Sequence, residues 1–234
     1  MDSALANSWY AVTGDVDLGK SSCPVTRLTK ALTGTKDSLP VKCLLAHRTT
    51  SKHMASLNRS GTITESLLII TGGMGVGKTS VLGEASDVLT LRHIPHAAID
   101  VDALGLACLP TATGNDEVMY RNLRSACNNY ASLGVTRFLL ARALENRAEL
   151  DLCRGIVSAA NTVVCRLTAD IETMEQRVKM RESGVLQRAY VARVAELNVI
   201  LDRARLEDFS LTCENHSLTE IAHEMLVRAG WISN

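Results

Sequence analysis

The sequence predicts an α/β fold, namely a three-layer α/β/α sandwich built on a five-stranded parallel sheet. Two observations predict it. Apolar runs of strand length alternate with segments of helical periodicity, and the first run enters a glycine-rich turn that is followed by a lysine, a hydroxyl residue and a helix. Such an alternation joins parallel strands through right-handed crossovers, so helices cover both faces of the sheet.

Five runs rich in apolar and β-branched residues are expected to form the strands. The second ends in two acids, and the fifth is the weakest. Their expected ranges are 67–70, 96–102, 135–141, 162–167 and 209–213.

Six helices are expected, and residues 103–115 form a loop because they contain two glycines and a proline. Asp170 is expected to cap the fourth helix, and Ser217 with Glu220 to form a capping box at the sixth. The apolar face of the second helix is expected to hold Val118, Leu123, Ala126, Cys127 and Tyr130, and that of the fourth Ile171, Met174 and Val178. The first helix runs from the glycine-rich turn to about residue 91, and the others cover 116–133, 145–156, 171–183, 186–205 and 218–229.

Residues 1–62 differ in composition from the domain that residues 63–234 are expected to form. They hold eight basic and four acidic side chains, a charge of +4, and no sustained apolar period. We expect a loosely ordered extension, because little apolar surface is present to offset the entropy of ordering. A partner-binding or targeting arm is the alternative, and Met54 could be the true start.

The overall composition indicates a globular protein without a nucleic-acid partner. The 25 basic and 25 acidic residues give a net charge of zero, so no strongly basic surface is indicated. The seven cysteines are odd in number and form no C-x-x-C pair, as in a reduced cytoplasmic protein. Neither a membrane-spanning run of about 20 apolar residues nor a secretory signal is expected.

The glycine-rich turn matches the phosphate-binding pattern G-x-x-x-x-G-K-[ST]. Glycines let backbone N–H groups curl around a polyphosphate, and the following helix adds the positive end of its dipole. Lys78 is expected to reach the β- and γ-phosphates of a nucleotide, and the Thr79 hydroxyl to hold Mg²⁺; an ordinary glycine turn is the alternative. The predicted nucleotide-binding residues are Gly72, Gly73, Met74, Gly75, Val76, Gly77, Lys78, Thr79 and Ser80.

Asp100 and Asp102 end the second strand two residues apart, which places both carboxylates on one face of the sheet. Phosphoryl transfer needs one carboxylate to orient or deprotonate the attacking hydroxyl and another to help hold Mg²⁺. Asp100 is the preferred base and Asp102 the metal-associated residue, although the order is open. The alternative is that one of them caps the following turn.

Arg177 and Arg181 lie four residues apart, on one face of the fourth helix. Arginines that close over the phosphates would stabilise the charge of the transferred group, and Gly184 suits a lid hinge. The alternative is a solvated basic face paired with Glu175 and Glu182. Two weaker candidates for the lid or substrate are Arg188 and Arg193.

The third strand ends in Ala141-Arg142 and lacks the acids of motor-type and transporter-type ATPases. This argues against ATP hydrolysis coupled to mechanical work. Arg142 and Glu145 either face an acceptor pocket or, as the interpretation that we favour, form a surface pair.

Over about residues 66–232 the chain resembles the small-molecule kinase branch of the P-loop proteins, which includes adenylylsulfate, gluconate, shikimate and nucleoside monophosphate kinases and chloramphenicol phosphotransferase. The resemblance is carried by Gly72 to Thr79, Ile99 to Leu104 and Cys165 to Glu182, with residues 215–231 fitting as well. The chain looks most like bacterial ATP-binding proteins that resemble adenylylsulfate kinase. This resemblance implies a nucleotide-kinase fold and ATP as the phosphate donor. It also implies that Asp100 or Asp102 contacts the acceptor or the metal, and that residues 214–217, which include Asn215, form a loop that packs on the adenine.

The sequence therefore predicts an ATP- and Mg²⁺-dependent kinase acting on a small hydroxyl- or phosphate-bearing acceptor. The rival is a regulatory module that binds a nucleotide without such an acceptor, and a third possibility is a kinase that modifies a protein or a nucleotide-sugar. The acceptor and the oligomeric state stay open.

Overall fold

A computed structural model describes residues 66–109 and 114–233 of the protein. The predicted extension at residues 1–62 lies outside the described residues, so it stays a prediction. The described part contains a single five-stranded sheet in which every pairing is parallel. The predicted α/β sandwich is therefore confirmed.

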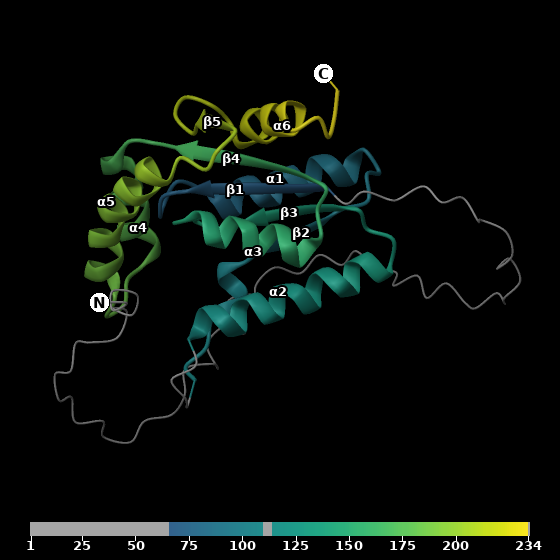
Figure 1. Ribbon diagram of the computed structural model, residues 1–234. Coiled ribbons are helices and arrows are strands. Elements are labelled where there is room, and N and C mark those ends of the chain that lie inside the picture. The colour runs from purple at the N-terminus through teal and green to yellow at the C-terminus, as the bar shows by residue number, and fades with distance from the viewer. Residues whose placement is uncertain (1–65, 110–113, 234) are drawn as a thin grey trace, which may run out of the picture. The chain divides into compact units, whose positions relative to one another are not determined.

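The strands lie in the order β2-β3-β1-β4-β5, which places β1 at the centre of the sheet (Figure 1). The register pairs Ile69 with Leu140 of β3 and Ile70 with Cys165 of β4. Both edges of β1 are thus hydrogen-bonded, and its residues 67–72 are all buried. The strands are β1 Ser66–Gly72, β2 Ala97–Asp100, β3 Arg137–Ala141, β4 Asn161–Thr168 and β5 Phe209–Thr212.

Helices cover both faces of the sheet, because the apolar side chains of β1 alternate between them. Leu68 and Ile70 pack with buried residues of α1, α4, α5 and α6, whereas Leu67 and Ile69 pack with those of α2 and α3. Helices α4 and α5 lie side by side at one end of the sheet, at the left in Figure 1. The helices are α1 Lys78–Leu91, the 3₁₀ helix η1 Asp102–Gly105, α2 Asn115–Ser132, α3 Arg147–Val157, α4 Ile171–Arg181, α5 Gln187–Ala204 and α6 Leu218–Arg228.

Two of the predicted helix caps can be compared with the structure. The capping box is confirmed: the Ser217 hydroxyl accepts from the Glu220 N–H, and the Glu220 carboxylate accepts from the Ser217 N–H. Asp170 occupies the N-cap position of α4, but its side chain accepts no capping hydrogen bond. Its own N–H donates to the Glu214 carboxylate instead, which links the turn before α6 to the start of α4.

The buried faces of α4 and α2 do not contain all the residues that were predicted for them. Ile171 is 47% exposed, and only Met174 and Val178 of the predicted α4 stripe are buried. Ile171 is the first residue of α4 and lies outside the buried core of that helix. In α2 the prediction was wrong for Tyr130, which is 43% exposed, because the buried face passes instead through Met119, Tyr120, Leu123 and Cys127.

The second strand is shorter than predicted. It ends at Asp100, because Val101 adopts helical backbone angles with φ −68° and ψ −36°, and η1 begins at Asp102. Val101 is fully buried, and its N–H donates to the Ala141 carbonyl oxygen at 3.1 Å. Asp100 and Asp102 therefore do not share a strand, and the predicted period-two placement is wrong.

No helix in the described ranges is both long and apolar enough to span a bilayer.

The central packing can be tested with a matched pair of leucines. Leu139 of β3 is fully buried between β1 and β2, whereas Leu133 at the end of α2 is 81% exposed. Leu139→Ala should lower the free energy of unfolding by about 2–5 kcal/mol, because it removes buried methyl groups and leaves a cavity. Leu133→Ala should change it by less than about 0.5 kcal/mol. Urea unfolding followed by circular dichroism measures both, and equal effects would contradict the packing described.

Candidate active site

The glycine-rich turn links β1 to α1 and has a backbone that only glycine adopts easily. Gly75 and Gly77 have φ values of +82° and +110°, in the left-handed region. A Cβ atom on Gly75 would lie 2.5 Å from the Met174 carbonyl oxygen of α4. The loop therefore passes close to α4, and both its dihedral angles and its packing require glycine at position 75.

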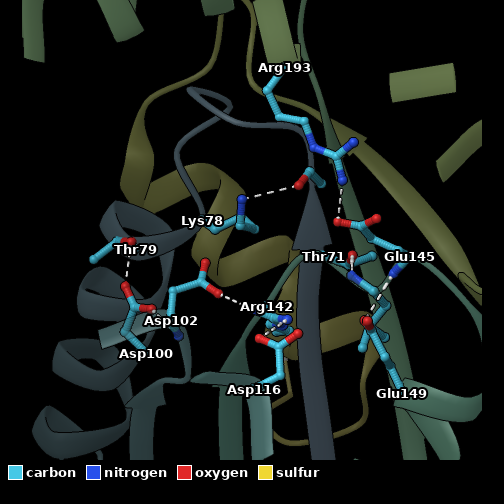
Figure 2. Close-up of polar contacts among 12 residues, drawn as sticks. Thr71, Lys78, Thr79, Asp100, Asp102, Asp116, Arg142, Glu145, Glu149 and Arg193 are labelled. Carbon is cyan, nitrogen blue, oxygen red and sulfur yellow. Dashed lines mark hydrogen bonds and ion pairs between the residues drawn. The ribbon is translucent and has the colours of Figure 1, made fainter. Parts of the chain in front are cut away.

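Lys78 stands at the start of α1 and folds back over the loop (Figure 2). Its Nζ donates to the carbonyl oxygens of Gly72 and Gly73, each at 3.1 Å. Burial lowers the pKa of Lys78, and the carboxylates of Asp102 and Asp100 act in the opposite direction. The ammonium group thus lies within electrostatic reach of both acids.

Asp100 is bound to the side chain that was predicted to hold a metal. The Thr79 hydroxyl donates to Asp100 Oδ2 at 2.7 Å, and Asp100 Oδ1 accepts from the Asp102 N–H at 3.2 Å (Figure 2). Asp100 therefore belongs to the Thr79 side of the site.

Asp102 is instead paired with Arg142, the residue that follows β3. Arg142 Nη1 lies 2.5 Å from Asp102, and Nη2 lies 3.6 Å from Asp116 at the start of α2. The guanidinium also lies over the ring of Tyr120, with its carbon 6.0 Å from the ring centroid. The Arg142 side chain is only 15% exposed. Burial, the largest single effect, lowers the pKa of Arg142, but Asp102 together with Tyr120 and Glu149 raises it overall.

Arg142 and Glu145 do not form the surface pair favoured by the sequence interpretation. Glu145 binds Arg193 of α5, with Arg193 Nη2 2.7 Å from Glu145 Oε1 (Figure 2). Arg193 is buried and also lies 2.6 Å from Glu196. The segment between β3 and α3 is thus tied to α2 and η1 through Arg142 and to α5 through Glu145.

The two predicted lid arginines have different surroundings. Arg177 Nη1 donates to the carbonyl oxygens of Val76 at 3.3 Å and Gly75 at 3.5 Å. It therefore supports the glycine-rich turn, Gly72 to Thr79, which we call the phosphate loop. Arg181 is paired with Glu182 at 2.8 Å and is exposed, and its charge lowers the pKa of Lys78. Arg181 therefore fits the alternative of a solvated basic face, although it lies near enough to the loop to affect Lys78. Arg177 does not fit that alternative, because it is bonded to the loop.

Asn215 lies in the turn before α6, with a positive φ of 58° and an exposed side chain. Asparagine tolerates this conformation better than most residues. The neighbouring Glu214 carboxylate connects the turn to the N-terminus of α4.

The donor set fits Mg²⁺. The Thr79 hydroxyl and the Asp100 carboxylate are adjacent oxygen ligands, the type that Mg²⁺ requires. Among the described residues, no group of three or more His, Cys, Asp or Glu side chains could hold a metal ion. Mg²⁺ usually keeps several waters and binds through one or two carboxylates plus substrate phosphates, so such a group is not required.

Several contacts of the site were missed by the sequence analysis. The buried Thr71 hydroxyl accepts from the Leu144 N–H at 3.0 Å, which fixes the segment after β3 to the end of β1. Asn198 of α5 approaches Gly73, where a Cβ atom would lie 2.8 Å from its Oδ1. Asp116 and Tyr120 reach Arg142 from α2. No sequence pattern marks these residues of β1, α2 and α5 as part of a site, because their contacts form only when the elements pack together.

Comparison of the whole chain with solved structures identifies the fold. The tunicamycin resistance protein of Deinococcus radiodurans matches with a TM-score of 0.50 and 14% identity, over 72% of this chain and 97% of that one. The chain has the nucleotide-kinase fold. Shikimate kinase from Acinetobacter baumannii gives a TM-score of 0.48 and 16% identity over 70% and 91% of the two chains, and the APS kinase of Mycobacterium tuberculosis gives 0.46 and 18% over 71% and 98%.

The fold that the resemblance to P-loop small-molecule kinases implied is confirmed by the five-stranded parallel sheet with helices on both faces. A scan of protein-family models and a search of curated proteins found no match.

Two glycine substitutions test the local geometry of this kinase fold. Gly75→Ala should lower the free energy of unfolding by at least about 1–3 kcal/mol, because a positive φ and the Met174 carbonyl both oppose a Cβ atom. Gly83→Ala, in the middle of α1 with open space around it, should raise it by about 0.5–1 kcal/mol. Chemical denaturation measures both changes, and effects of the same sign would refute the described loop.

Proposed function

We propose that the protein is an ATP- and Mg²⁺-dependent kinase that transfers the γ-phosphoryl group of ATP to a small-molecule acceptor. The observation that carries the proposal is the position of Lys78, which lies on the phosphate loop within electrostatic reach of two acids. Asp100 is hydrogen-bonded to Thr79, and Asp102 is paired with Arg142. The lysine would therefore lie between the phosphate-binding residues and a second polar group that could receive an acceptor.

We assign the two aspartates in the order opposite to the one preferred from the sequence. Asp100 would help to position Mg²⁺, because it is hydrogen-bonded to the Thr79 hydroxyl. Asp102 would receive the acceptor hydroxyl, because its carboxylate is paired with Arg142 near the start of α2 rather than with Thr79. Mg²⁺ held by Thr79 and Asp100 would supply positive charge that neutralises the charge developing on the phosphates during transfer.

The proposed step requires positioning more than covalent participation by the protein. The acceptor oxygen forms a bond to the γ-phosphorus, the bond from that phosphorus to the β–γ bridging oxygen breaks, and the acceptor proton passes to the Asp102 carboxylate. ADP leaves with the bridging oxygen. Lys78 would leave the carbonyl oxygens of Gly72 and Gly73 and bind the β- and γ-phosphates, since an ammonium donor is stabilised more by phosphate than by neutral carbonyls.

Three further residues receive proposed roles. Arg177 would hold the phosphate loop in shape through its bonds to Val76 and Gly75. Arg181, at the exposed end of α4, would contact the transferred group. Asn215 and its turn would lie near the adenine, a role suggested by the family resemblance.

A cytoplasmic location is proposed from the thiols. Cys127, Cys153 and Cys165 are buried and unbridged, and burial raises the pKa of Cys153 and of Cys165 to about 12. Such thiols stay protonated and unreactive at neutral pH, as suits a reducing compartment.

Substitution of Lys78 tests the enzyme assignment. Lys78→Ala should reduce phosphoryl transfer by about 10²-fold or more, because one charged stabiliser of the transferred phosphoryl group is removed. Mass detection of a product gaining one phosphate would measure this, across nucleoside monophosphates, sugar acids, adenylylsulfate and hydroxylated antibiotics. Lys179→Ala is the matched control, because Lys179 is an exposed residue of α4 paired with Glu175, and it should retain full activity. Full turnover in Lys78→Ala would refute the assignment.

Substitution of Asp100 and of Asp102 should have different effects. Asp102→Asn should lower kcat by about 10²–10⁴-fold, because it removes the group that accepts the proton, and should change the Kd for Mg·ATP far less. Asp100→Asn should raise the Mg²⁺ concentration required for half-maximal ATP binding. Isothermal titration calorimetry and steady-state rates provide both readouts. Nucleotide binding without turnover in the unsubstituted protein on every acceptor would favour the regulatory module.

A further inference from the structure

A hollow of about 580 Å³ lies at the edge of the sheet opposite the phosphate loop. Its volume falls in the range of small-molecule sites, about 300–1,000 Å³. The polar or aromatic side chains on which the argument depends are Ser66, Arg137, Arg154, Asn161 and Trp231.

The hollow is formed where the three central strands begin. In the register of the sheet, Ser66 of β1 pairs with Arg137 of β3 and with Asn161 of β4. Strand β1 runs from Ser66 to Gly72 at the phosphate loop, six steps of about 3.3 Å each, or about 20 Å. The hollow is thus separate from the candidate active site.

Arg137 is the unsatisfied charge in this hollow. It is half-buried at the start of β3, and its guanidinium makes no hydrogen bond or ion pair with any described residue. Arg154 of α3 adds a second guanidinium, whose nearest acid, Asp151, is 4.0 Å away. The Thr162 hydroxyl oxygen is buried without a hydrogen-bond partner, so it does not face the hollow. Two guanidinium groups therefore line the same space, and that of Arg137 has no partner among the described residues.

The remaining walls are rigid. Trp231 is buried, and its Nε1 donates to the Ser66 Oγ at 3.2 Å, which fixes the end of α6 against the start of β1. The C-terminal ends of α3 and α6 lie nearby and disfavour anions, but this effect is about 0.3–1 kcal/mol and fades within the last turn. Arg154 lies in that turn of α3 and offsets its dipole, whereas the charge of Arg137, on a strand, stays available.

We propose that this hollow binds a small molecule carrying a phosphate- or sulfate-type oxyanion. Arg137 and Arg154 would supply the guanidinium donors that such oxygens prefer. The rival occupant is the chain's own N-terminal segment, which leads into Ser66. Residues 1–65 hold eight basic and five acidic side chains, hence 8 − 5 = +3, the same sign as the two arginines. Charge complementarity therefore favours an external anion.

Binding can be measured on the full chain carrying Lys78→Ala, which weakens competing phosphate binding at the loop. Isothermal titration calorimetry with inorganic phosphate and with glycerol 3-phosphate should show saturable binding. Arg137→Gln should weaken it about tenfold or more, as expected when a charged hydrogen-bond donor is lost. Tighter binding of glycerol 3-phosphate would indicate an oxyanion borne on a metabolite, and tighter binding of phosphate the free ion; both support the site.

The control is Arg147→Gln on α3, since Arg147 is exposed, pairs with Asp151 and does not line the hollow. It should bind both probes unchanged. The proposal is overturned by no saturable binding, or by equal losses in Arg137→Gln and Arg147→Gln. Thermal melting verifies folding of each variant, and Arg154→Gln provides a second test if Arg137→Gln unfolds. Because Lys78→Ala lacks the proposed transfer activity, the result does not depend on the proposed function.

Discussion

The arrangement of the site depends on β1, a strand buried on both faces and hydrogen-bonded along both edges. Its last residues hold the functional segments in place. The Ile70 carbonyl oxygen accepts from the Arg142 N–H at 3.0 Å, and the Thr71 hydroxyl accepts from the Leu144 N–H. Gly72 is in register with Leu167 of β4, whose carbonyl oxygen would lie 2.7 Å from a Cβ atom. The phosphate loop and the segment after β3 are therefore positioned by one buried strand that is paired along both edges.

Charge alternation explains how ionic groups gather beside this strand. Lys78 is within electrostatic reach of Asp102, Asp102 is paired with Arg142, and Arg142 also lies near Asp116. Asp100, the other acid near Lys78, is hydrogen-bonded to Thr79. Each partly buried charge has an opposite charge or a hydrogen-bond donor beside it, which offsets much of the desolvation that burial requires. Loss of any one member would leave its neighbour uncompensated, so substitutions here affect the local structure as well as the chemistry.

The fold and the phosphate loop could be predicted from the sequence because their signals are local. Apolar runs of strand length and the pattern from Gly72 to Thr79 report on contacts within a few residues. The partners of Arg142 could not be predicted, since Asp102 and Asp116 are 40 and 26 positions away along the chain and meet it only after η1 and α2 pack on β3. The placement of Asp102 failed for a related reason: Val101 adopts helical backbone angles and is buried with apolar residues of α2 and α3, which ends the strand two residues early.

The ion pair between Asp102 and Arg142 favours phosphoryl transfer over simple nucleotide binding. A module that only binds a nucleotide needs the loop, Lys78 and the Thr79 branch, none of which contacts Arg142 through a described hydrogen bond. The carboxylates also favour the charged form of the mostly buried guanidinium, because the pKa of Arg142 is raised although burial opposes this. One role of the pair is therefore to hold the segment after β3 in place. In the proposed reaction, an acceptor hydroxyl placed against Asp102, with Arg142 fixing the orientation of that carboxylate, would give the pair a chemical role within reach of Lys78.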